Sequence, residues 1–352
     1  MPYQYFVSTI LLSSSLLAQS PLAEAIEKID HRGELRFGAI QTEDSQGDKA
    51  TTVALGGRVT LETKPLNGIS LVGSFFTTNP LFGKRDEGMF LGSSNQGYSI
   101  VGESYLKVAM GKSLFKAGRQ LLDTPYADSD DIGMIPNSFE GYSLVNQDLS
   151  DTTLIVALLD KYAGIDADVA EKFSDLQSSK DPILVGGVIY EGIEKSSLEV
   201  WHYNMDDADF NYAEFGYEAD TFSMGLQYTD QENSNRAYGV AVGGKIDNLA
   251  INFAYNRVKG IVSNGFGGGP FFTSSEDHTI EDSQDQEARL YGATYQFGDL
   301  SMGVTHVAFD KGENETDYLV SLTINKHHTL DVIYSDMYDD GNMVRFFANY
   351  SF

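Results

Sequence analysis

The chain has 352 residues, no cysteine and a formal net charge of −27, with 51 acidic residues against 24 basic ones. This acidity argues against nucleic acid as a partner, because phosphate contacts need clustered Lys and Arg. The lack of cysteine excludes disulfide bonds and cysteine-ligated metal sites. A hydrophobic content of 41% is too high for a disordered acidic tail.

The first 20 residues carry the pattern of a secretory signal peptide. The apolar stretch YFVSTILLSSSLLA at 5–18 is shorter than the roughly 18 apolar residues of a membrane helix, and small residues follow it. We place the cleavage between Ala18 and Ala23. No Lys or Arg precedes the stretch, unlike in most signal peptides, and a buried N-terminal segment is the alternative. A signal on a cysteine-free, Tyr-rich and Gly-rich acidic chain indicates the Gram-negative envelope.

From Gly33 onward the apolar residues recur at every second position, which is typical of half-buried strands. The preceding residues 21–32 are expected to be a periplasmic segment, with one or two helical turns over 21–33. Most alternating segments have about the 9 to 11 residues that a tilted strand needs to cross a bilayer. About 18 strands are predicted, near residues 33–41, 50–63, 67–77, 97–109, 112–119, 137–147, 152–161, 182–190, 195–204, 210–218, 221–229, 236–246, 248–257, 287–297, 299–309, 316–325, 329–337 and 343–352.

The connections between these strands alternate between long and short. For example, the long stretch 78–96 comes before the turn at 111–112, and 258–286 comes before the turn at 298–299. A soluble β-sandwich has no reason to alternate in this way, whereas an outer-membrane barrel has short periplasmic turns and long external loops. The sequence therefore predicts an all-β fold: a transmembrane antiparallel β-barrel of about 18 strands over 33–352, with an aqueous lumen and both termini in the periplasm.

The last predicted strand, MVRFFANYSF, ends on aromatic residues. Tyr350 and Phe352 are expected at the periplasmic interface, where aromatic girdles lie. The strand is predicted to pair with the first one, near 33–41, and so to close the barrel. The terminal Phe352 also resembles the signal that the outer-membrane assembly machinery reads, which makes that machinery an expected partner. The predicted lipid face consists of Val344, Phe346, Ala348, Tyr350 and Phe352.

The third long connection, residues 120–136, is the strongest candidate for a functional segment. In porins one loop folds inward and narrows the lumen, and the charges on that loop set the selectivity. Pro125, Gly133 and Pro136 supply turns that favour such a fold. The candidate constriction residues are Asp123, Tyr126, Asp128, Asp130 and Asp131.

Within this region, DTPYADSDDIGMIPNSFEG at 123–141 resembles the constriction loop of the OprD-type family of substrate-selective outer membrane porins, in the form found in campylobacter-like bacteria. LAEAIEKIDHRGELRFG at 22–38, LGGRVTLETKPLNGISL at 55–71 and the terminal NYSF are similar to the same family. The resemblance is specific over about 22–150. It implies an 18-stranded barrel that passes small hydrophilic molecules such as amino acids, peptides or carboxylates.

Two departures from the family pattern point away from a carboxylate-specific pore. Gly133 stands where family members often carry an Arg, and the family's ladder of lumenal bases is sparse here. We therefore expect a cation-preferring lumen with the loop carboxylates as a negative ring, the alternative being that these carboxylates face external solvent. By strand phase, the charges facing the lumen are Arg36, Arg58, Lys107 and Arg345, accompanied by Glu34, Glu62 and Glu103.

Three arginines on successive strands, Arg236, Arg257 and Arg289, are expected on the lipid-facing side at the external end of the barrel. Arg costs little near the membrane interface and suits phosphate groups, so a contact with lipopolysaccharide is predicted. The alternative is that these arginines pair with neighbouring acids such as Glu287.

No arrangement for catalysis, for a cofactor or for a metal stands out. The six His show no metal-ligand spacing apart from the adjacent His327 and His328. The stretch GFGGGPFF at 265–272 lacks the helix that follows a phosphate-binding loop, and it is expected to be a flexible external tip. The runner-up function is an adhesin or structural surface protein acting through 258–286. The sequence leaves open the transported solute, Ca²⁺ binding by the acidic loops, and the choice between a monomer and a homo-oligomer.

Overall fold

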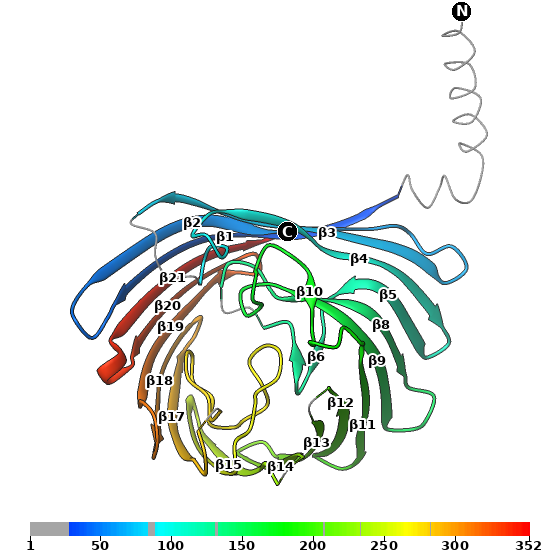
Figure 1. Ribbon diagram of the computed structural model, residues 1–352. Helices are drawn as coiled ribbons and strands as arrows, with labels where there is room; N and C mark the ends of the chain where they lie inside the picture. The colour runs from blue at the N-terminus through cyan, green and yellow to red at the C-terminus, as the bar shows by residue number, and fades with distance from the viewer. Residues whose placement is uncertain (1–27, 84–88, 131–132, 207, 233, 282) are drawn as a thin grey trace, which may run out of the picture.

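Eighteen long antiparallel strands form a β-barrel in the computed structural model, which describes residues 28–352 except 84–88, 131–132, 207, 233 and 282 (Figure 1). The signal peptide expected at 1–20 lies outside the described residues. Within the described ranges, no helix is long and apolar enough to cross a membrane.

Every predicted strand is present in the barrel. The largest boundary difference is at β3, which continues to Phe82 where the sequence pattern predicted an end at residue 77. The long strands are β1 (Asp30–Glu43), β2 (Lys49–Glu62), β3 (Ile69–Phe82), β4 (Tyr98–Met110), β5 (Ser113–Gln120), β8 (Ser138–Asn146), β9 (Thr152–Ala163), β11 (Ile183–Ile193), β12 (Ser196–Asn204), β13 (Asp209–Glu218), β14 (Phe222–Gln231), β15 (Arg236–Ile246), β16 (Leu249–Lys259), β17 (Glu287–Phe297), β18 (Leu300–Phe309), β19 (Glu315–Asn325), β20 (His328–Asp336) and β21 (Asn342–Ser351).

The remaining described elements are short. β6 (Asp123–Thr124) and β7 (Ala127–Asp128) pair with each other, and β10 (Ser174–Asp175) pairs with β9. A 3-10 helix covers Tyr338–Asp340.

The helical turns expected over 21–33 are contradicted at the end of that range. Asp30 already belongs to β1 and pairs with Glu62 of β2. Pairing with a neighbouring strand here outweighs the helical spacing of the local sequence. Residues 21–27 lie outside the described part of the chain.

The first and last strands close the barrel, as the sequence predicts. β1 and β21 are antiparallel, with Glu34 opposite Ser351. The Gly33 N–H donates to the Phe352 carbonyl and the Phe352 N–H donates to the Gly33 carbonyl, both at 3.0 Å. Closure gives each long strand of the described sheet two neighbours, which satisfies backbone groups that hydrocarbon would leave unpaired.

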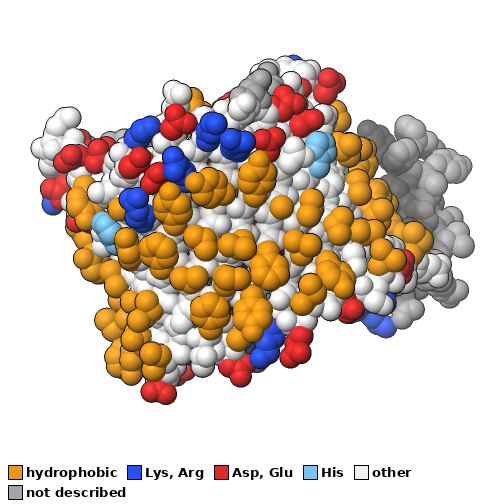
Figure 2. All heavy atoms as spheres, turned by 90° about the horizontal axis from the view of Figure 1, so that it is seen from below, with side chains coloured by type: hydrophobic (Ala, Val, Ile, Leu, Met, Phe, Trp, Pro, Cys, Tyr) orange, Lys and Arg blue, Asp and Glu red, His pale blue; other side chains and the backbone are white. Residues whose placement is uncertain are grey.

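The outward side of the sheet is apolar, whereas the inward side carries polar residues together with apolar ones that pack against the loops. Leu71 and Phe75 of β3 are more than half exposed, whereas Ser74 between them is buried; on β21, Tyr350 is exposed and Arg345 is buried. Figure 2 shows apolar side chains as a band across one outer face, with charged side chains at both of its margins. This is the surface expected of a barrel surrounded by lipid.

The two ends of the barrel carry different connections, as the sequence predicts. One end has tight turns, where Gly111, Lys195, Asp247 and Gly298 adopt the positive φ that two-residue hairpin turns need. The described termini, at the start of β1 and the end of β21, lie at this end. The opposite end carries the long connections.

Four of the long connections in the described part fold into the barrel instead of away from it. The segments after β3, β5, β9 and β16 bury side chains against inward-facing residues of the wall, including Phe90, Tyr126, Ala170 and Phe271 respectively. The lumen is therefore partly filled by its own loops, and these loops position the candidate site.

Candidate functional site

The constriction hairpin, residues 121–130, contains β6 and β7. Asp123 and Asp128 are paired across it, and Pro125 and Tyr126 make the turn. Figure 1 shows β6 inside the ring of strands, in the space that the barrel encloses. The hairpin therefore divides the lumen.

Tyr126 anchors the constriction hairpin to β12, β13 and β14. Its side chain is fully buried, and its ring meets those of Tyr203, Phe210 and Tyr212 edge to face. Its hydroxyl donates to Thr229 Oγ1 at 2.6 Å, and its N–H donates to the Tyr203 hydroxyl at 3.2 Å. Among the predicted constriction residues, Tyr126 thus holds the hairpin in place and does not line the opening.

The inner loop, residues 260–286 between β16 and β17, folds into the lumen and meets the constriction hairpin. The Phe266 N–H donates to the Tyr126 carbonyl at 3.0 Å, and the Asp128 N–H donates to the Phe266 carbonyl at 2.9 Å. The prediction that the glycine-rich stretch 265–272 forms a flexible external tip is therefore wrong. A Cβ on Gly267, whose φ is 103°, would lie 2.4 Å from the Asp128 carbonyl oxygen, so glycine permits this close contact.

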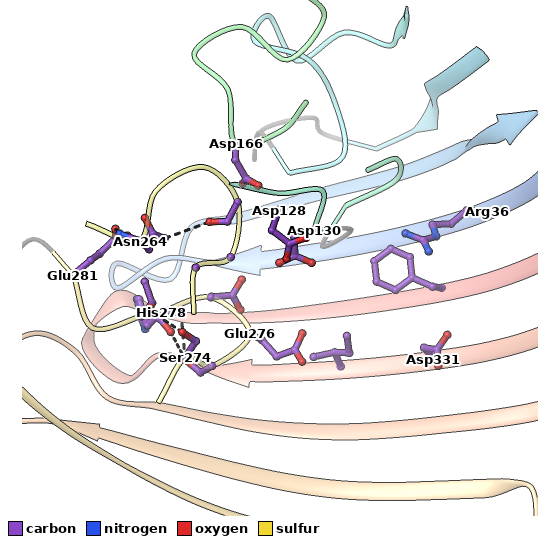
Figure 3. A pocket seen from close by; sticks show the side chains of 18 of the residues that line it. Arg36, Asp128, Asp130, Asp166, Asn264, Ser274, Glu276, His278, Glu281 and Asp331 are labelled. Atoms are coloured by element: carbon purple, nitrogen blue, oxygen red, sulfur yellow. Dashed lines mark hydrogen bonds between the residues drawn. The ribbon is translucent and has the colours of Figure 1, made fainter. Parts of the chain in front are cut away.

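A cavity of about 680 Å³, called the main cavity below, lies between these loops and the wall. In Figure 3, Asp128 and Asp130 lie between the inner loop on one side and Arg36 and Asp331 on the other, and Asp166 lies above the inner loop. Its described lining has an excess of acid, because it contains seven carboxyl groups but only Arg36 and His278 as bases, and Arg345 behind the lining pairs with just two of the seven. These are Asp128, Asp130, Asp166, Glu276, Asp277, Glu281 and Asp331.

A second cavity, of about 330 Å³, also borders the constriction hairpin. Its described lining contains Asp123, Asp128, Glu199 and Glu214 and no Lys or Arg. Asp128 lines both cavities, so it is the one predicted constriction residue shared by the two spaces beside the hairpin. Asp131 lies outside the described residues.

Several lining acids were missed by the sequence analysis. Glu199 on β12 and Asp331 on β20 alternate with the exposed Val200 and Val332, so a complete analysis of strand phase would have placed both on the inside. Asp166 lies in a long connection without periodicity, where no local pattern indicates which side chains turn inward.

The carboxyl group of Asp128 titrates in an unusual range. Burial and the nearby carboxylates of Asp123 and Asp130 raise its pKa to about 6. Burial also raises the pKa of Asp166, although its hydrogen bond from Asn137 opposes the shift. Protonation can therefore neutralise part of the negative charge of the constriction near neutral pH.

Arg36 is the one Arg or Lys among the described residues that line the main cavity. Its Nη2 pairs with Glu34 at 3.0 Å, its Nε donates to Asn349 at 2.8 Å, and its Nη1 donates to the Gly133 carbonyl at 2.6 Å. Its guanidinium also lies 5.2 Å from the ring centroid of Phe347. Gly133 stands where members of the family often carry an Arg. The carbonyl of Gly133 accepts a hydrogen bond from Arg36, an arginine of the barrel wall.

The other lumen charges predicted from strand phase are mostly paired with one another. Lys107 Nζ lies 2.8 Å from Glu62, and Arg58 lies 3.8 Å from Glu34. Glu103 is buried. These pairs leave little net positive charge on the wall.

Arg345 faces the inside of β21 but is covered by the inner loop. Its side chain is 1% exposed, and its Nη2 lies 3.0 Å from Asp277 and 3.4 Å from Glu276. The same nitrogen donates to Ser335 Oγ at 3.2 Å. Arg345 thus holds the inner loop and is not accessible as a lining charge.

The three arginines expected on the lipid face do point outward, at the end of the barrel that carries the long connections. Arg257 and Arg289 share Glu287, at 3.5 and 3.0 Å, and each remains about half exposed. Arg236 is exposed beside Lys259 and has no carboxylate at ion-pair distance among the described residues. Figure 2 shows basic side chains gathered at one margin of the apolar band.

The sequence matches the OprD family of outer membrane porins over residues 59–265, which is more than half of the chain. The protein belongs to the OprD family. It is a non-enzymatic porin of the bacterial outer membrane, and it serves the diffusion of small solutes. No curated protein sequence matches the chain.

Solved structures of other outer membrane proteins share the fold of this OprD-family porin. OpdK of Pseudomonas aeruginosa with vanillate has a TM-score of 0.79 at 15% identity, covering 93% of this chain and 99% of its own. OccAB1 of Acinetobacter baumannii has a TM-score of 0.76 at 16% identity, covering 95% and 99%. A BenF-like porin of Pseudomonas fluorescens has a TM-score of 0.79 at 14% identity, covering 93% and 99%. The predicted 18-stranded barrel is confirmed.

Proposed function

We propose that this OprD-family porin is a cation-preferring passive channel, whose selectivity comes from the carboxylates of its constriction. The observation that carries the proposal is the main cavity, where seven carboxyl groups line the space with Arg36 and His278, and the covered Arg345 pairs with only two of the seven. A charged ring in a narrow aqueous passage concentrates ions of opposite sign. The alternative, that these Asp residues lie on external solvent-facing loops, has less support because Asp128 lies on the inward-folded hairpin.

The reversal potential of the purified protein in a planar bilayer, measured across a KCl gradient, tests this proposal. We expect its sign to show that K⁺ permeates more readily than Cl⁻. Anion preference in the unmodified protein would overturn the proposal.

The same charge distribution suggests which solutes pass. A carboxylate such as the vanillate seen with OpdK would meet an excess of negative charge here. We therefore propose cationic, zwitterionic or neutral hydrophilic solutes as the transported class. Liposome swelling with basic amino acids, neutral amino acids, peptides and dicarboxylates should rank the dicarboxylates as the slowest.

An adhesin acting through residues 258–286 has less support. The inner loop forms hydrogen bonds with the constriction hairpin and buries Phe271 and Ile280 against the wall, so its main features face inward. A barrel that conducts no current in single-channel recordings would favour the adhesin instead.

The cation preference should weaken when the pH falls through about 6. Asp128 is ionised above its pKa of about 6 and protonated below it, whereas a carboxyl group with an ordinary pKa of about 3.9 stays charged at pH 5. Reversal potentials at a series of pH values between about 7.5 and 5 should therefore show a loss of K⁺ preference. Asp128→Asn should remove much of this step, leaving the contribution of Asp166. A constant preference over the whole range would contradict the prediction.

We also propose that Arg236, Arg257 and Arg289, with Lys259, bind phosphate groups of lipopolysaccharide. The patch points outward, at the margin of the apolar band, and Glu287 is its only ion-pair partner among the described residues. The planar guanidinium matches phosphate geometry.

Replacing the three arginines with glutamine should weaken lipopolysaccharide binding by at least about tenfold, because each base near an anionic lipid surface contributes about 1 kcal/mol. Native mass spectrometry and thermal unfolding with lipid A, and with dephosphorylated lipid A, provide the measurement. The matched control replaces exposed lysines at the short-turn end, Lys195, Lys245 and Lys326. Equal binding of lipid A by both triple variants would contradict the proposal.

We also propose that the chain belongs to the campylobacter-like branch of the family, which the sequence similarity at 22–38 and 55–71 supports. Recognition by the outer-membrane assembly machinery is supported by Phe352, which is 40% exposed and stacks on Tyr350. Deleting Phe352 should slow assembly in cells while leaving refolding in detergent largely intact.

A further inference from the structure

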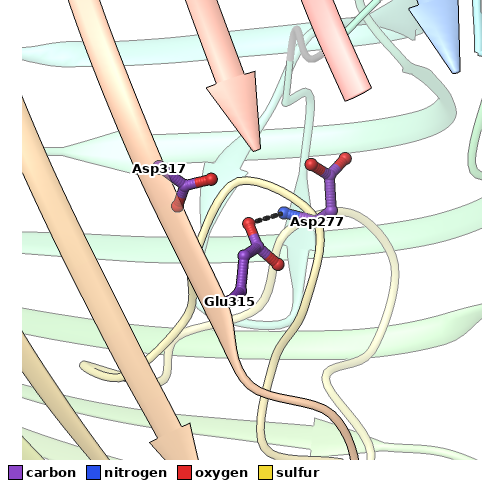
Figure 4. A group of neighbouring side chains, drawn as sticks. All are labelled: Asp277, Glu315 and Asp317. Atoms are coloured by element: carbon purple, nitrogen blue, oxygen red, sulfur yellow. Dashed lines mark hydrogen bonds between the residues drawn. The ribbon is translucent and has the colours of Figure 1, made fainter. Parts of the chain in front are cut away.

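A compact group of carboxylates lies where the inner loop crosses the wall. Asp277 belongs to the inner loop, and Glu315 and Asp317 belong to β19 (Figure 4). One carboxylate oxygen from each of the three lies within 4.8 Å of the others. Asp277 is far from the other two residues in the sequence, and it meets them only because the loop folds inward.

The group is withdrawn from water. Glu315 and Asp317 are 0% and 1% exposed, and the Asp277 side chain is 9% exposed. The Asp277 N–H donates to Glu315 at 3.0 Å, and the Glu276 N–H reaches Asp317 Oδ2 at 3.4 Å. Asp317 Oδ1 is buried and accepts no hydrogen bond of normal geometry, although the Glu315 carboxyl group and the Ser335 hydroxyl lie close to the Asp317 carboxyl group. A buried carboxylate oxygen without a partner is costly, so this atom itself indicates a missing ligand.

The neighbouring bases do not supply the missing partner. Arg345 lies against Asp277 and Glu276, and His278 Nδ1 lies 2.9 Å from Glu315 Oε2. Among the described residues, no base lies within ion-pair distance of Asp317. Three buried carboxylates this close together need a cation or a shared proton.

The spacing and chemistry fit a calcium ion. Ca²⁺ binds oxygen ligands at about 2.3 to 2.6 Å, so two oxygens on one ion are at most about 5 Å apart. The group supplies only oxygen ligands, carries high negative charge and combines an irregular loop with a strand, and Ca²⁺ tolerates such irregular geometry better than Mg²⁺ does. We propose that Asp277, Glu315 and Asp317 bind one Ca²⁺ ion, which fastens the inner loop to β19.

The ion would stabilise the shape of the main cavity, because the neighbouring Glu276, Asp277 and His278 all line it. This role is distinct from the cation preference, because Glu315 and Asp317 are not lining residues and Asp277 is only one of the seven lining carboxylates. If the protein does not bind Ca²⁺ here, the proposal of a cation-preferring lumen still stands.

Isothermal titration calorimetry tests the site with Ca²⁺ alone as the probe. The full-length protein in detergent is stripped with EDTA and titrated in about 0.15 M KCl, which screens weak binding to exposed acids. We expect one saturable Ca²⁺ site per chain.

Asp317→Asn should weaken the Ca²⁺ affinity of this site at least about tenfold, since ligand charge sets Ca²⁺ affinity. Asp331→Asn removes a carboxylate on the neighbouring strand β20, which accepts hydrogen bonds from Ser321 and Asn349, and it should leave the Ca²⁺ affinity unchanged.

Three results would overturn the proposal: no saturable Ca²⁺ binding, equal affinity in Asp317→Asn, or binding of Mg²⁺ in preference to Ca²⁺. A shared proton in place of the ion would give the first of these results. If Asp317→Asn does not fold, as judged by circular dichroism and heat-dependent gel mobility, Asp277→Asn replaces it. That change is confined to the loop and leaves β19 intact, and retained Ca²⁺ affinity in it would equally overturn the assignment.

Discussion

Replacing Asp128, Asp130 and Asp166 together with asparagine should lower the ratio of K⁺ to Cl⁻ permeability by about tenfold or more. A carboxylate about 6 Å from the path of an ion attracts a monovalent cation by about 0.7 kcal/mol in water, which is about threefold in permeability for each charge. The substitution keeps the side-chain size, so the opening should stay the same. Reversal potential and single-channel conductance of the same preparation separate selectivity from pore size.

The control for this variant removes the same number of charges from the same end of the barrel. Asp48, Asp181 and Asp339 are exposed on connections at this end of the barrel and line neither cavity. Their triple replacement with asparagine should change the permeability ratio little, because exposed charges far from the path are screened. Equal effects of the two triple variants would mean that net surface charge, and not the constriction, governs selectivity.

Tyr126→Ala should release the constriction hairpin and give a channel with larger, noisier conductance. The substitution empties a fully buried site among Tyr203, Phe210 and Tyr212, and truncating a buried aromatic costs about 3 to 5 kcal/mol. Single-channel recordings give the conductance and its noise. Limited proteolysis measures how often the hairpin becomes accessible.

Tyr126→Phe is the matched comparison, because it keeps the ring and removes only the hydrogen bond to Thr229. Its expected cost is about 1 kcal/mol, so its conductance should stay close to that of the unmodified channel. If Tyr126→Ala has the same conductance and protease resistance as Tyr126→Phe, the ring does not anchor the hairpin.

Much of the barrel is predictable from the sequence because each strand carries its own signal. On β3, exposed Leu71 and Phe75 flank buried Ser74, and this alternation records the boundary between lipid and water at every strand. Short turns are equally local, since Asp247 or Gly298 in a two-residue connection specifies a hairpin.

The site is only partly predictable, because loops carry no such period. The acids of the constriction hairpin were found from their density in one segment. Glu276 and Asp277 were not, because their inward position depends on contact with Arg345, which is distant in the sequence. The buried state of Arg345 has the same cause: strand phase places it inside, but only the fold of the inner loop shows that it is covered.

The pairing of β1 with β21 has a consequence for how the protein is made. β1 is the first strand in the sequence and β21 is the last, so the hydrogen bonds between them cannot form until the C-terminal strand has reached the membrane. Until then the growing sheet has two open edges, which hydrocarbon disfavours and which other chains can pair with. Closure is therefore the last and most non-local step of folding, and we expect it to limit the rate of assembly.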